Sequence, residues 1–253
     1  MIDYDVRGHV AVMTINRPEA RNAVNGAVAS GIEDALDRLE ADDDIWVAVL
    51  AGAGPVFSAG ADLKEIASGN AGGLTTARGG FAGLVARERT KPLIAAVDGP
   101  ALAGGTEIVL ACDLVVASRE ARFGVPEVKR SLVAAAGGLF RLAQKLPQNV
   151  ATELVLTGDP IDATRAHELG LVNALCEPGE ALDAALALAE RIAANAPLAV
   201  RESLTVMRES RRVDDATALR LSGQAMARLA STEDYAEGPR AFIEKRAPEW
   251  KGR

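Results

Sequence analysis

The sequence predicts an α/β core followed by a helical C-terminal region. Short apolar segments alternate with segments of helical periodicity over the first two thirds of the chain, and no convincing strand follows Pro178. We therefore expect a core at residues 1–195 and a helical region at residues 196–253. Alternation of strands and helices by itself favours a doubly wound parallel sheet.

The expected strands are short runs of β-branched and other apolar residues. Tyr4–Arg7 and Val10–Asn16 are expected to pair through the turn at Gly8 and His9. Three later runs are continuously apolar, which is typical of buried strands: Trp46–Ala51, Leu93–Val97 and Leu114–Ala117.

Helices are expected where apolar residues recur every three or four positions. This spacing occurs within Ile32–Leu39 and within Leu182–Ala193. Two further helices are expected at Thr75–Arg89 and Thr106–Cys112. Ser68–Gly80 contains five glycines and little apolar content, so we expect a mobile loop there.

Composition narrows the classes of function. A net charge of −7 and a pI of about 5.1 argue against a nucleic-acid binder. No signal peptide begins at Met1, and no uncharged apolar run reaches the ~20 residues that span a bilayer, so we expect a cytoplasmic protein without membrane contact. The two histidines, His9 and His167, exclude an HExxH metal site, and no metal ligand set is expected. Cys112 and Cys176 are expected to be free thiols.

Two glutamates stand in segments that suggest a site. Glu107 follows Gly104-Gly105-Thr106 at the start of a helical run, and Glu127 follows the short segment Phe123–Pro126. Two carboxyl groups that converge on one pocket can divide acid and base work between them. Such a pair could add or remove water without a metal or a histidine.

Two loops could supply main-chain hydrogen-bond donors to the same pocket. The segment Phe57–Lys64 leads into an expected helix, and its small residues 59–61 let a ligand approach the backbone closely. Gly104 and Gly105 precede a second helix. N–H groups at helix entries favour an oxyanion, and two of them from separate loops could hold one carbonyl oxygen.

The chain resembles the crotonase superfamily, and within it the enoyl-CoA hydratases. The resemblance rests on segments that occur in order along nearly the whole chain: Ile15–Ala23, Phe57–Glu65, Gly99–Glu107, Ala121–Glu127, Ala136–Gly138, Leu156–Asp159 and Phe242–Pro248. It implies a spiral of ββα units rather than a doubly wound sheet, with a helical C-terminal trimerisation region. It also implies a homotrimer or a dimer of trimers.

The resemblance further implies an acyl-CoA thioester substrate, with no metal and no tightly bound cofactor, since coenzyme A arrives as part of the substrate. Glu107 and Glu127 match the two catalytic acids of the family, and the N–H groups of Ala59 and Gly104 match its oxyanion hole. The expected coenzyme A contacts are Arg21, Ala23, Ala59, Gly60, Ala61, Asp62, Leu63, Gly104 and Lys245. Lys245 is expected to reach the coenzyme A of a neighbouring subunit.

Retention of both glutamates favours hydration of a trans-2-enoyl-CoA to a 3-hydroxyacyl-CoA, with Glu127 as the proton donor to C2 and Glu107 as the base that activates water. An enoyl-CoA isomerase, a dehydratase of the carnitinyl-CoA type and a non-catalytic acyl-CoA binder remain alternatives. Val128–Ser131 departs from the family pattern, so Ser131 must adopt a backbone shape that usually belongs to glycine. The acyl group, including whether it belongs to fatty acid metabolism, stays open.

Overall fold

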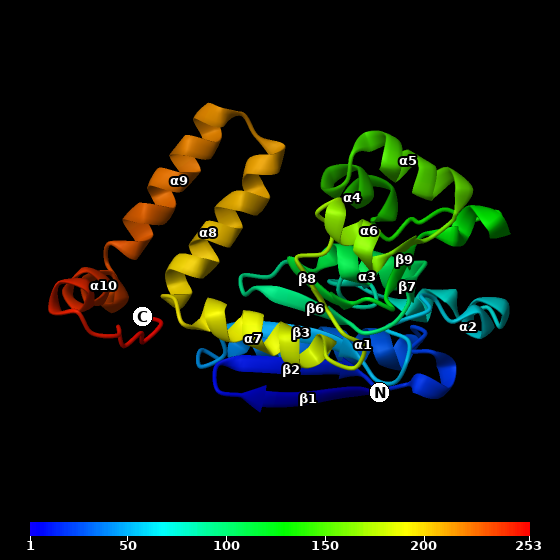
Figure 1. Cartoon of the computed structure of the whole chain (residues 1–253), viewed down its shortest axis with the longest axis horizontal. Coiled ribbons are helices and arrows are strands. Elements are labelled where there is room, and N and C mark those ends of the chain that lie inside the picture. The colour runs from blue at the N-terminus through cyan, green and yellow to red at the C-terminus, as the bar shows by residue number, and fades with distance from the viewer.

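The computed structural model describes the whole chain, residues 1–253, and its largest sheet has six strands (Figure 1). The first two strands form an antiparallel hairpin, and all the other neighbours in the sheet are parallel. In spatial order the strands are β1 (Ile2–Arg7), β2 (Val10–Ile15), β3 (Val47–Gly52), β6 (Leu93–Val97), β8 (Leu114–Ser118) and β11 (Ala174–Cys176).

Helices follow or separate these strands along the chain. The longest ones cover the sheet or form the C-terminal region, and the shorter ones lie in the connections. Their bounds are α1 (Gly26–Ala41), α2 (Leu63–Ala67), α3 (Gly104–Ala111), α4 (Gly138–Lys145), α5 (Gln148–Thr157), α6 (Ala163–Glu168), α7 (Ala181–Ala193), α8 (Pro197–Glu209), α9 (Asp215–Leu229) and α10 (Glu233–Glu244).

Alternation along β3 shows how both faces of the sheet are buried. Val47 and Val49 belong to the smaller apolar cluster, which α7 covers. Ala48 and Leu50 point to the opposite face and join the larger cluster, which includes the buried side of α1. Since side chains alternate between the faces of a strand, a continuously apolar run such as Trp46–Ala51 is what a strand covered on both sides requires.

A second, smaller layer of strands runs beside the large sheet. It contains β10 (Ile161–Asp162), β9 (Arg122–Gly124) and β7 (Ala101–Leu102), in that order. Isolated bridges extend the layer toward the N-terminus, from Ser58 to Ala101 and from Val24 to Ala61. Successive turns of the chain therefore contribute one strand to the large sheet and one segment to the small layer. This arrangement confirms the expected spiral, and the doubly wound alternative is wrong.

The helix expected at Thr75–Arg89 is wrong. The chain instead forms the hairpin of β4 (Thr75–Thr76) and β5 (Gly80–Phe81), followed by turns. Gly80, Ala82 and Gly83 have φ values of +65°, +56° and +64°, which a right-handed helix excludes. The segment 68–80, expected to be a loop, also contains a 3₁₀ turn and β4.

The C-terminal helices project from the core. In Figure 1, α7 lies along the sheet, whereas α8 and α9 extend from it as a pair and α10 lies at the far end. Asp113 connects α8 to the core, because its carboxylate binds Arg208 at 2.7 Å and Arg89 at 3.1 Å. The division at residue 195 stays a prediction. No helix has the length and apolar composition that crossing a membrane requires.

Ser131 has a backbone conformation that usually belongs to glycine, as the sequence predicted. Its φ and ψ are 57° and 35°, in the left-handed region. We expect Ser131→Gly to raise the free energy of unfolding by about 0.5–1 kcal/mol, because relief of the left-handed penalty exceeds the extra chain entropy of glycine. Chemical denaturation measures this. Ser68→Gly, at a φ of −83°, should lower stability instead, and a gain at both serines would contradict the explanation.

Candidate active site

The small layer brings the two predicted glycine loops together. Gly60 has a φ of +85°, and a Cβ atom placed on it would lie 2.6 Å from the Gly104 nitrogen. A Cβ atom on Gly104 would in turn lie 3.3 Å from the Gly60 Cα and 2.5 Å from Phe81 Cζ. Only glycine fits at these two positions without movement of the main chain or of the Phe81 ring. The loops therefore meet backbone to backbone.

Glu107 lies in the first turn of α3 and is almost completely buried, with 3% of its surface exposed. Its Oε1 atom accepts a hydrogen bond from the Gly138 N–H at 2.9 Å. Burial raises the pKa of Glu107 to about 7, because removal from water disfavours the charged form. The Gly138 N–H lowers this pKa, and the charge of Glu127 raises it further.

Glu127 lies in a 3₁₀ turn, Pro126–Arg130, that directly follows β9. Its Oε2 atom is buried and has no hydrogen-bond partner in the chain. Burial raises the pKa of Glu127, while the charge of Arg130 acts in the opposite direction. A buried carboxyl oxygen without a partner is costly unless a ligand or water binds it. Glu127 is thus suited to contact a bound molecule.

Glu107 and the segment that precedes Glu127 both lie beside Gly138. A Cβ atom on Gly138 would lie 3.1 Å from Glu107 Oε1 and 3.3 Å from Val125 Cγ1, two residues before Glu127. Glu127 also acts on the pKa of Glu107. Two acids that interact in this way resist simultaneous ionisation, so the pair can hold one proton over a range of pH. Such a pair can supply both a base and an acid.

The two predicted main-chain donors differ in their hydrogen bonds. Gly104 is the first residue of α3, so its N–H has no intrahelical carbonyl partner. The Ala59 N–H donates to the Arg21 carbonyl at 3.0 Å. Ala59 would have to share or exchange this bond to bind a thioester oxygen. The sequence did not anticipate the bond, and the role of Ala59 stays a prediction.

Most of the residues expected to contact coenzyme A lie side by side. Arg21 and Ala23 run next to Ala59–Asp62, because the Val24 N–H donates to the Gly60 carbonyl at 2.7 Å and the Asp62 N–H donates to the Val24 carbonyl at 2.9 Å. Arg21 is exposed, with a φ of 53°. This edge can therefore present a cation and main-chain groups to a phosphate-bearing ligand.

The Asp62 side chain has a structural role, apart from the expected contact with coenzyme A. Its carboxylate accepts the Lys64 N–H at 2.9 Å, which caps α2, and binds the Arg17 guanidinium at 2.6 Å. The hydrogen bond from Arg17 is the main cause that lowers the pKa of Asp62. The Asp62 carboxylate is therefore not available to a ligand without loss of these bonds, and the Asp62 N–H and carbonyl are already bonded to Val24 and Ile66. Leu63, the first residue of α2, is exposed.

Lys245 does not join this site within one chain. It ends α10, with a φ of 54°, and its side chain is exposed. In Figure 1, α10 lies at the opposite end of the molecule from α2. Contact between Lys245 and a coenzyme A molecule would need a second copy of the chain.

Two residues of the site had no predicted role. Gly138 supplies the hydrogen bond to Glu107, although the sequence only marked it as part of a matching segment. Arg141 donates to the Ala136 carbonyl at 3.2 Å and to the Val85 carbonyl at 2.5 Å, and its charge lowers the pKa of Glu107. The Gly137-Gly138 pair could have indicated a role for the Gly138 main chain, but no pattern around Arg141 indicates the contacts of Arg141.

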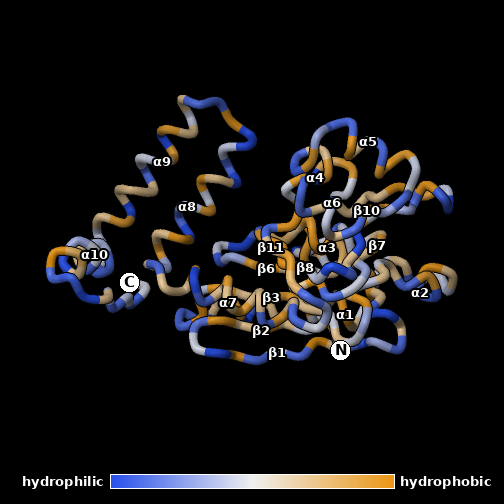
Figure 2. The backbone as a smooth tube through the Cα atoms, in the orientation of Figure 1, coloured by the Kyte–Doolittle hydropathy of each residue, from blue (hydrophilic) through white to orange (hydrophobic).

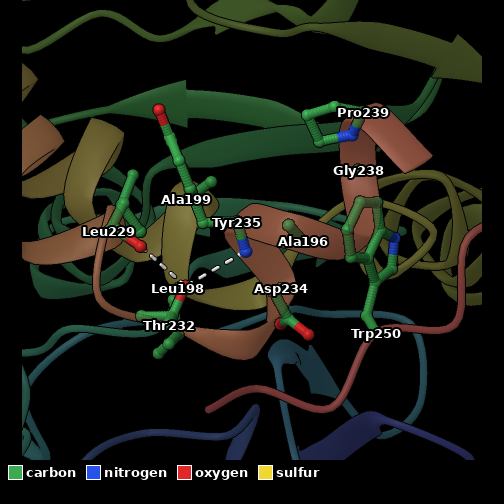
Figure 3. A pocket seen from close by; sticks show the side chains of 10 residues that line it. All are labelled: Ala196, Leu198, Ala199, Leu229, Thr232, Asp234, Tyr235, Gly238, Pro239 and Trp250. Atoms are coloured by element: carbon green, nitrogen blue, oxygen red, sulfur yellow. Dashed lines mark hydrogen bonds between the residues drawn. The ribbon is translucent and has the colours of Figure 1, made fainter. Parts of the chain in front are cut away.

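A separate apolar cavity of about 190 Å³ lies among the C-terminal helices (Figure 3). Leu198, Leu229, Tyr235 and Trp250 line it. The carboxylate of Asp234 at its edge is already occupied by the N–H groups of Lys251 and Gly252. The cavity lacks a free acid or base, so Glu107 and Glu127 remain the candidate centre for chemistry. No group of three or more His, Cys, Asp and Glu side chains is placed to hold a metal ion.

Comparisons with known proteins agree with one another. The family model described as enoyl-CoA hydratase/isomerase matches residues 5–253. Enoyl-CoA hydratase EchA19 of Mycobacterium tuberculosis is 42% identical over 253 residues, which cover 98% of the chain and 95% of that relative. Carnitinyl-CoA dehydratase of Proteus mirabilis is 38% identical over 253 residues, with coverage of 98% and 97%.

A solved structure extends the similarity to three dimensions. The crystal structure of an enoyl-CoA hydratase from Mycobacterium tuberculosis H37Rv superposes with a TM-score of 0.96 and is 50% identical in sequence. The match covers 100% of the present chain and 99% of the other. All the residues of the candidate site lie within the matched length.

Proposed function

The chain belongs to the enoyl-CoA hydratase/isomerase family, and from this premise we propose that it adds water to a trans-2-enoyl-CoA in the syn sense, giving a 3-hydroxyacyl-CoA. The pair of carboxyl groups, of which Glu107 is buried and Glu127 is half-buried, is the observation that carries this proposal. Both have raised pKa values, and one oxygen of Glu127 is buried without a partner. Hydration requires a base for water and an acid for C2, and the pair can provide both.

The reaction develops negative charge on the thioester oxygen as water attacks C3. The N–H of Gly104, with that of Ala59 after exchange of its bond to Arg21, would stabilise this enolate more than the ground state, which is the condition for acceleration. One carboxylate accepts a proton from water, and the other carboxyl group delivers a proton to C2. The pair holds one proton before and after the reaction, and exchange between the two carboxyl groups restores the starting state.

The division of roles within the pair stays a prediction. The sequence-based assignment makes Glu127 the proton donor. Glu107, however, is more deeply buried and has a pKa of about 7, and both properties favour the proton on Glu107 in the unliganded chain. We therefore treat the two carboxyl groups as a unit that titrates together.

A turnover screen tests the proposed reaction. The purified chain is offered crotonyl-CoA, longer and bulkier trans-2-enoyl-CoA esters, a 3-enoyl-CoA and carnitinyl-CoA, and the products are identified by mass spectrometry. Hydration of trans-2-enoyl esters with one solvent deuterium at C2 in D₂O is the expected result. Conversion of the 3-enoyl ester alone would favour an isomerase, and conversion of carnitinyl-CoA alone would favour the named activity of the Proteus relative. Binding of esters without turnover would establish the non-catalytic alternative.

The pKa of Glu107 predicts a pH dependence. Because the pair must hold one proton, kcat/KM should fall as pH rises through about 7, by about tenfold for each further pH unit. It should also fall at low pH, where protonation of both acids removes the base. Initial rates with crotonyl-CoA between pH 4.5 and 9 measure the profile. A rate that stays constant across this range would show that neither carboxyl group titrates in the rate-limiting step.

Arg21 is proposed to bind a phosphate of coenzyme A. We expect Arg21→Ala to raise KM for crotonyl-CoA roughly fivefold with kcat unchanged, since one exposed charge contact of about 1 kcal/mol is lost before the chemical step. Steady-state kinetics measure the split. Arg7→Ala removes an exposed arginine on β1 and should leave KM unaltered. An unchanged KM for Arg21→Ala would remove Arg21 from the site.

We also propose assembly as a trimer or a dimer of trimers. Large apolar side chains stand exposed on α10, where Phe242 is 85% and Ile243 is 78% accessible, and others lie on α8 and α9. Apolar segments alternate with polar ones along these helices (Figure 2). Exposed apolar surface of this kind is typical of an interface. Sedimentation equilibrium measures the mass of the assembly. The absence of a bound cofactor and the cytoplasmic location stay predictions.

A further inference from the structure

One buried hydroxyl connects the segments that carry the site. Thr106 is 1% exposed, and its Oγ1 atom lies 2.7 Å from the Ala101 carbonyl and 2.8 Å from the Gly124 carbonyl. The same oxygen accepts the Gly124 N–H at 3.0 Å. The Ala103 N–H also donates to the Gly124 carbonyl, at 2.9 Å. Thr106 therefore joins the ends of β7 and β9 to the first turn of α3.

The Thr106 hydroxyl can bond only one of the two carbonyls at a time. A threonine hydroxyl has one hydrogen, so it can donate to only one of the two carbonyls at a time. The Gly124 carbonyl already accepts the Ala103 N–H, whereas the Ala101 carbonyl is the nearer acceptor. The hydroxyl thus donates to one of these two carbonyls, of which Ala101 is the nearer, and accepts from the Gly124 N–H. Loss of the hydroxyl would leave a buried N–H and a buried carbonyl without this partner.

Each residue of this cluster is a near neighbour of a reacting group. Thr106 lies between Gly104 and Glu107 in the sequence, and Gly124 lies three residues before Glu127. Ala103 has a φ of 54° and a ψ of −128°, a strained conformation for a residue with a side chain. It sets the direction of the peptide that carries the Gly104 N–H. The strain persists only if surrounding bonds hold Ala103, and its bond to Gly124 is one of them.

We propose that Thr106 is a positioning residue, whose hydroxyl sets the spacing of Glu107 and Glu127 and the direction of the Gly104 N–H. The inference rests on the proposed hydration. Glu107 follows Thr106 directly on α3, and Glu127 is linked to Gly124 through Val125 and the ring of Pro126. A shift of the Gly124 peptide therefore moves one acid relative to the other. Misplacement of a reacting group by about 1 Å can cost ~10²-fold in rate.

The test compares Thr106→Val, which keeps the shape without the hydroxyl, with Thr106→Ser, which keeps the hydroxyl. Ser118→Ala is the matched control, because Ser118 is a buried hydroxyl that binds the Asp98 carbonyl and the Glu120 N–H. We expect Thr106→Val to lower kcat for crotonyl-CoA by about tenfold or more, with KM within about twofold of the wild type. Thr106→Ser should restore kcat to within about threefold. Ser118→Ala should lose stability but keep kcat.

A second measurement does not depend on turnover. In a titration followed by ¹³C NMR of the glutamate carboxyl groups, Thr106→Val should shift the pKa values of the Glu107–Glu127 pair, whereas Thr106→Ser and Ser118→Ala should not. Thr106→Ala replaces the valine variant if that chain does not fold. Unchanged pair titration in Thr106→Val, or equal effects in Thr106→Val and Thr106→Ser, would overturn the inference. Absence of enoyl-CoA turnover by the wild type would overturn the proposed reaction, and the titration would still decide the role of Thr106.

Discussion

Glu107→Gln and Glu127→Gln should each lower kcat for hydration of crotonyl-CoA by at least ~10²-fold, the usual contribution of a general acid or base. The glutamine amide keeps the size of the side chain and can still accept the Gly138 N–H at position 107. It cannot accept the proton of water or deliver one to C2. KM should change little, because neither substitution removes a coenzyme A contact. Steady-state rates over a range of substrate concentrations separate the two constants.

Stability measurements distinguish loss of chemistry from loss of structure. The pKa of Glu107 is raised from 4.5 to about 7, so the folded chain binds this proton more tightly than the unfolded chain. The free energy of unfolding therefore falls as pH rises from 4.5 through about 7, by on the order of 3 kcal/mol for this group. Glu107→Gln removes the ionisation, so at pH 8 we expect it to be more stable than the wild type while being less active.

Asp113→Asn provides the contrast for that result. Asp113 is also a largely enclosed acid, with 14% of its side chain exposed, but it is paired with Arg89 and Arg208, and these charges hold its pKa below the usual value. Loss of its charge should lower stability, because two arginines lose their partner, and should leave kcat near that of the wild type. Near-native turnover by either glutamine variant would remove that glutamate from the mechanism, whatever the stability.

Gly60→Ala should lower kcat by ~10²–10³-fold, the usual cost of losing an oxyanion donor. The new Cβ atom would lie 2.6 Å from the Gly104 nitrogen and 3.0 Å from the Ala103 Cβ. The nearest atom belongs to the main chain and not to a flexible side chain, so the peptide that carries the Gly104 N–H must move. The substitution alters a donor without replacing either glutamate, so it tests the oxyanion hole separately from the acid–base pair.

Gly170→Ala is the matched control for this substitution. Its φ of +82° is close to the +85° of Gly60, but a Cβ atom there would meet nothing within 4 Å. Both variants should lose about 1–2 kcal/mol of stability through the left-handed backbone, and Gly60→Ala should lose more through its contact with Gly104, but only Gly60→Ala should lose turnover. Equal kcat values for Gly60→Ala and the wild type would show that the contact between the two loops has no part in catalysis.

Much of the fold could be predicted because the order of apolar residues along a segment reflects how that segment is buried. The continuous apolar runs at Trp46–Ala51 and Leu93–Val97 are strands because both faces of the sheet are covered. The helix predicted at Thr75–Arg89 was wrong for a reason that composition does not show. The apolar residues of this segment satisfy helical spacing, but positive φ values at Gly80, Ala82 and Gly83 prevent a helix. The spacing of apolar residues does not indicate which glycines adopt a positive φ.

The sequence by itself determined the family, the two acidic side chains and the glycine loops, because these depend on residue type and on order along the chain. Only the tertiary structure decided that the Gly138 N–H binds Glu107, that the Ala59 N–H is engaged by Arg21, and that Thr106 joins β7 and β9. Each of these is a contact between separate segments at hydrogen-bond distance. Its geometry arises when successive turns of the spiral stack on one another, and no spacing along a single segment specifies it.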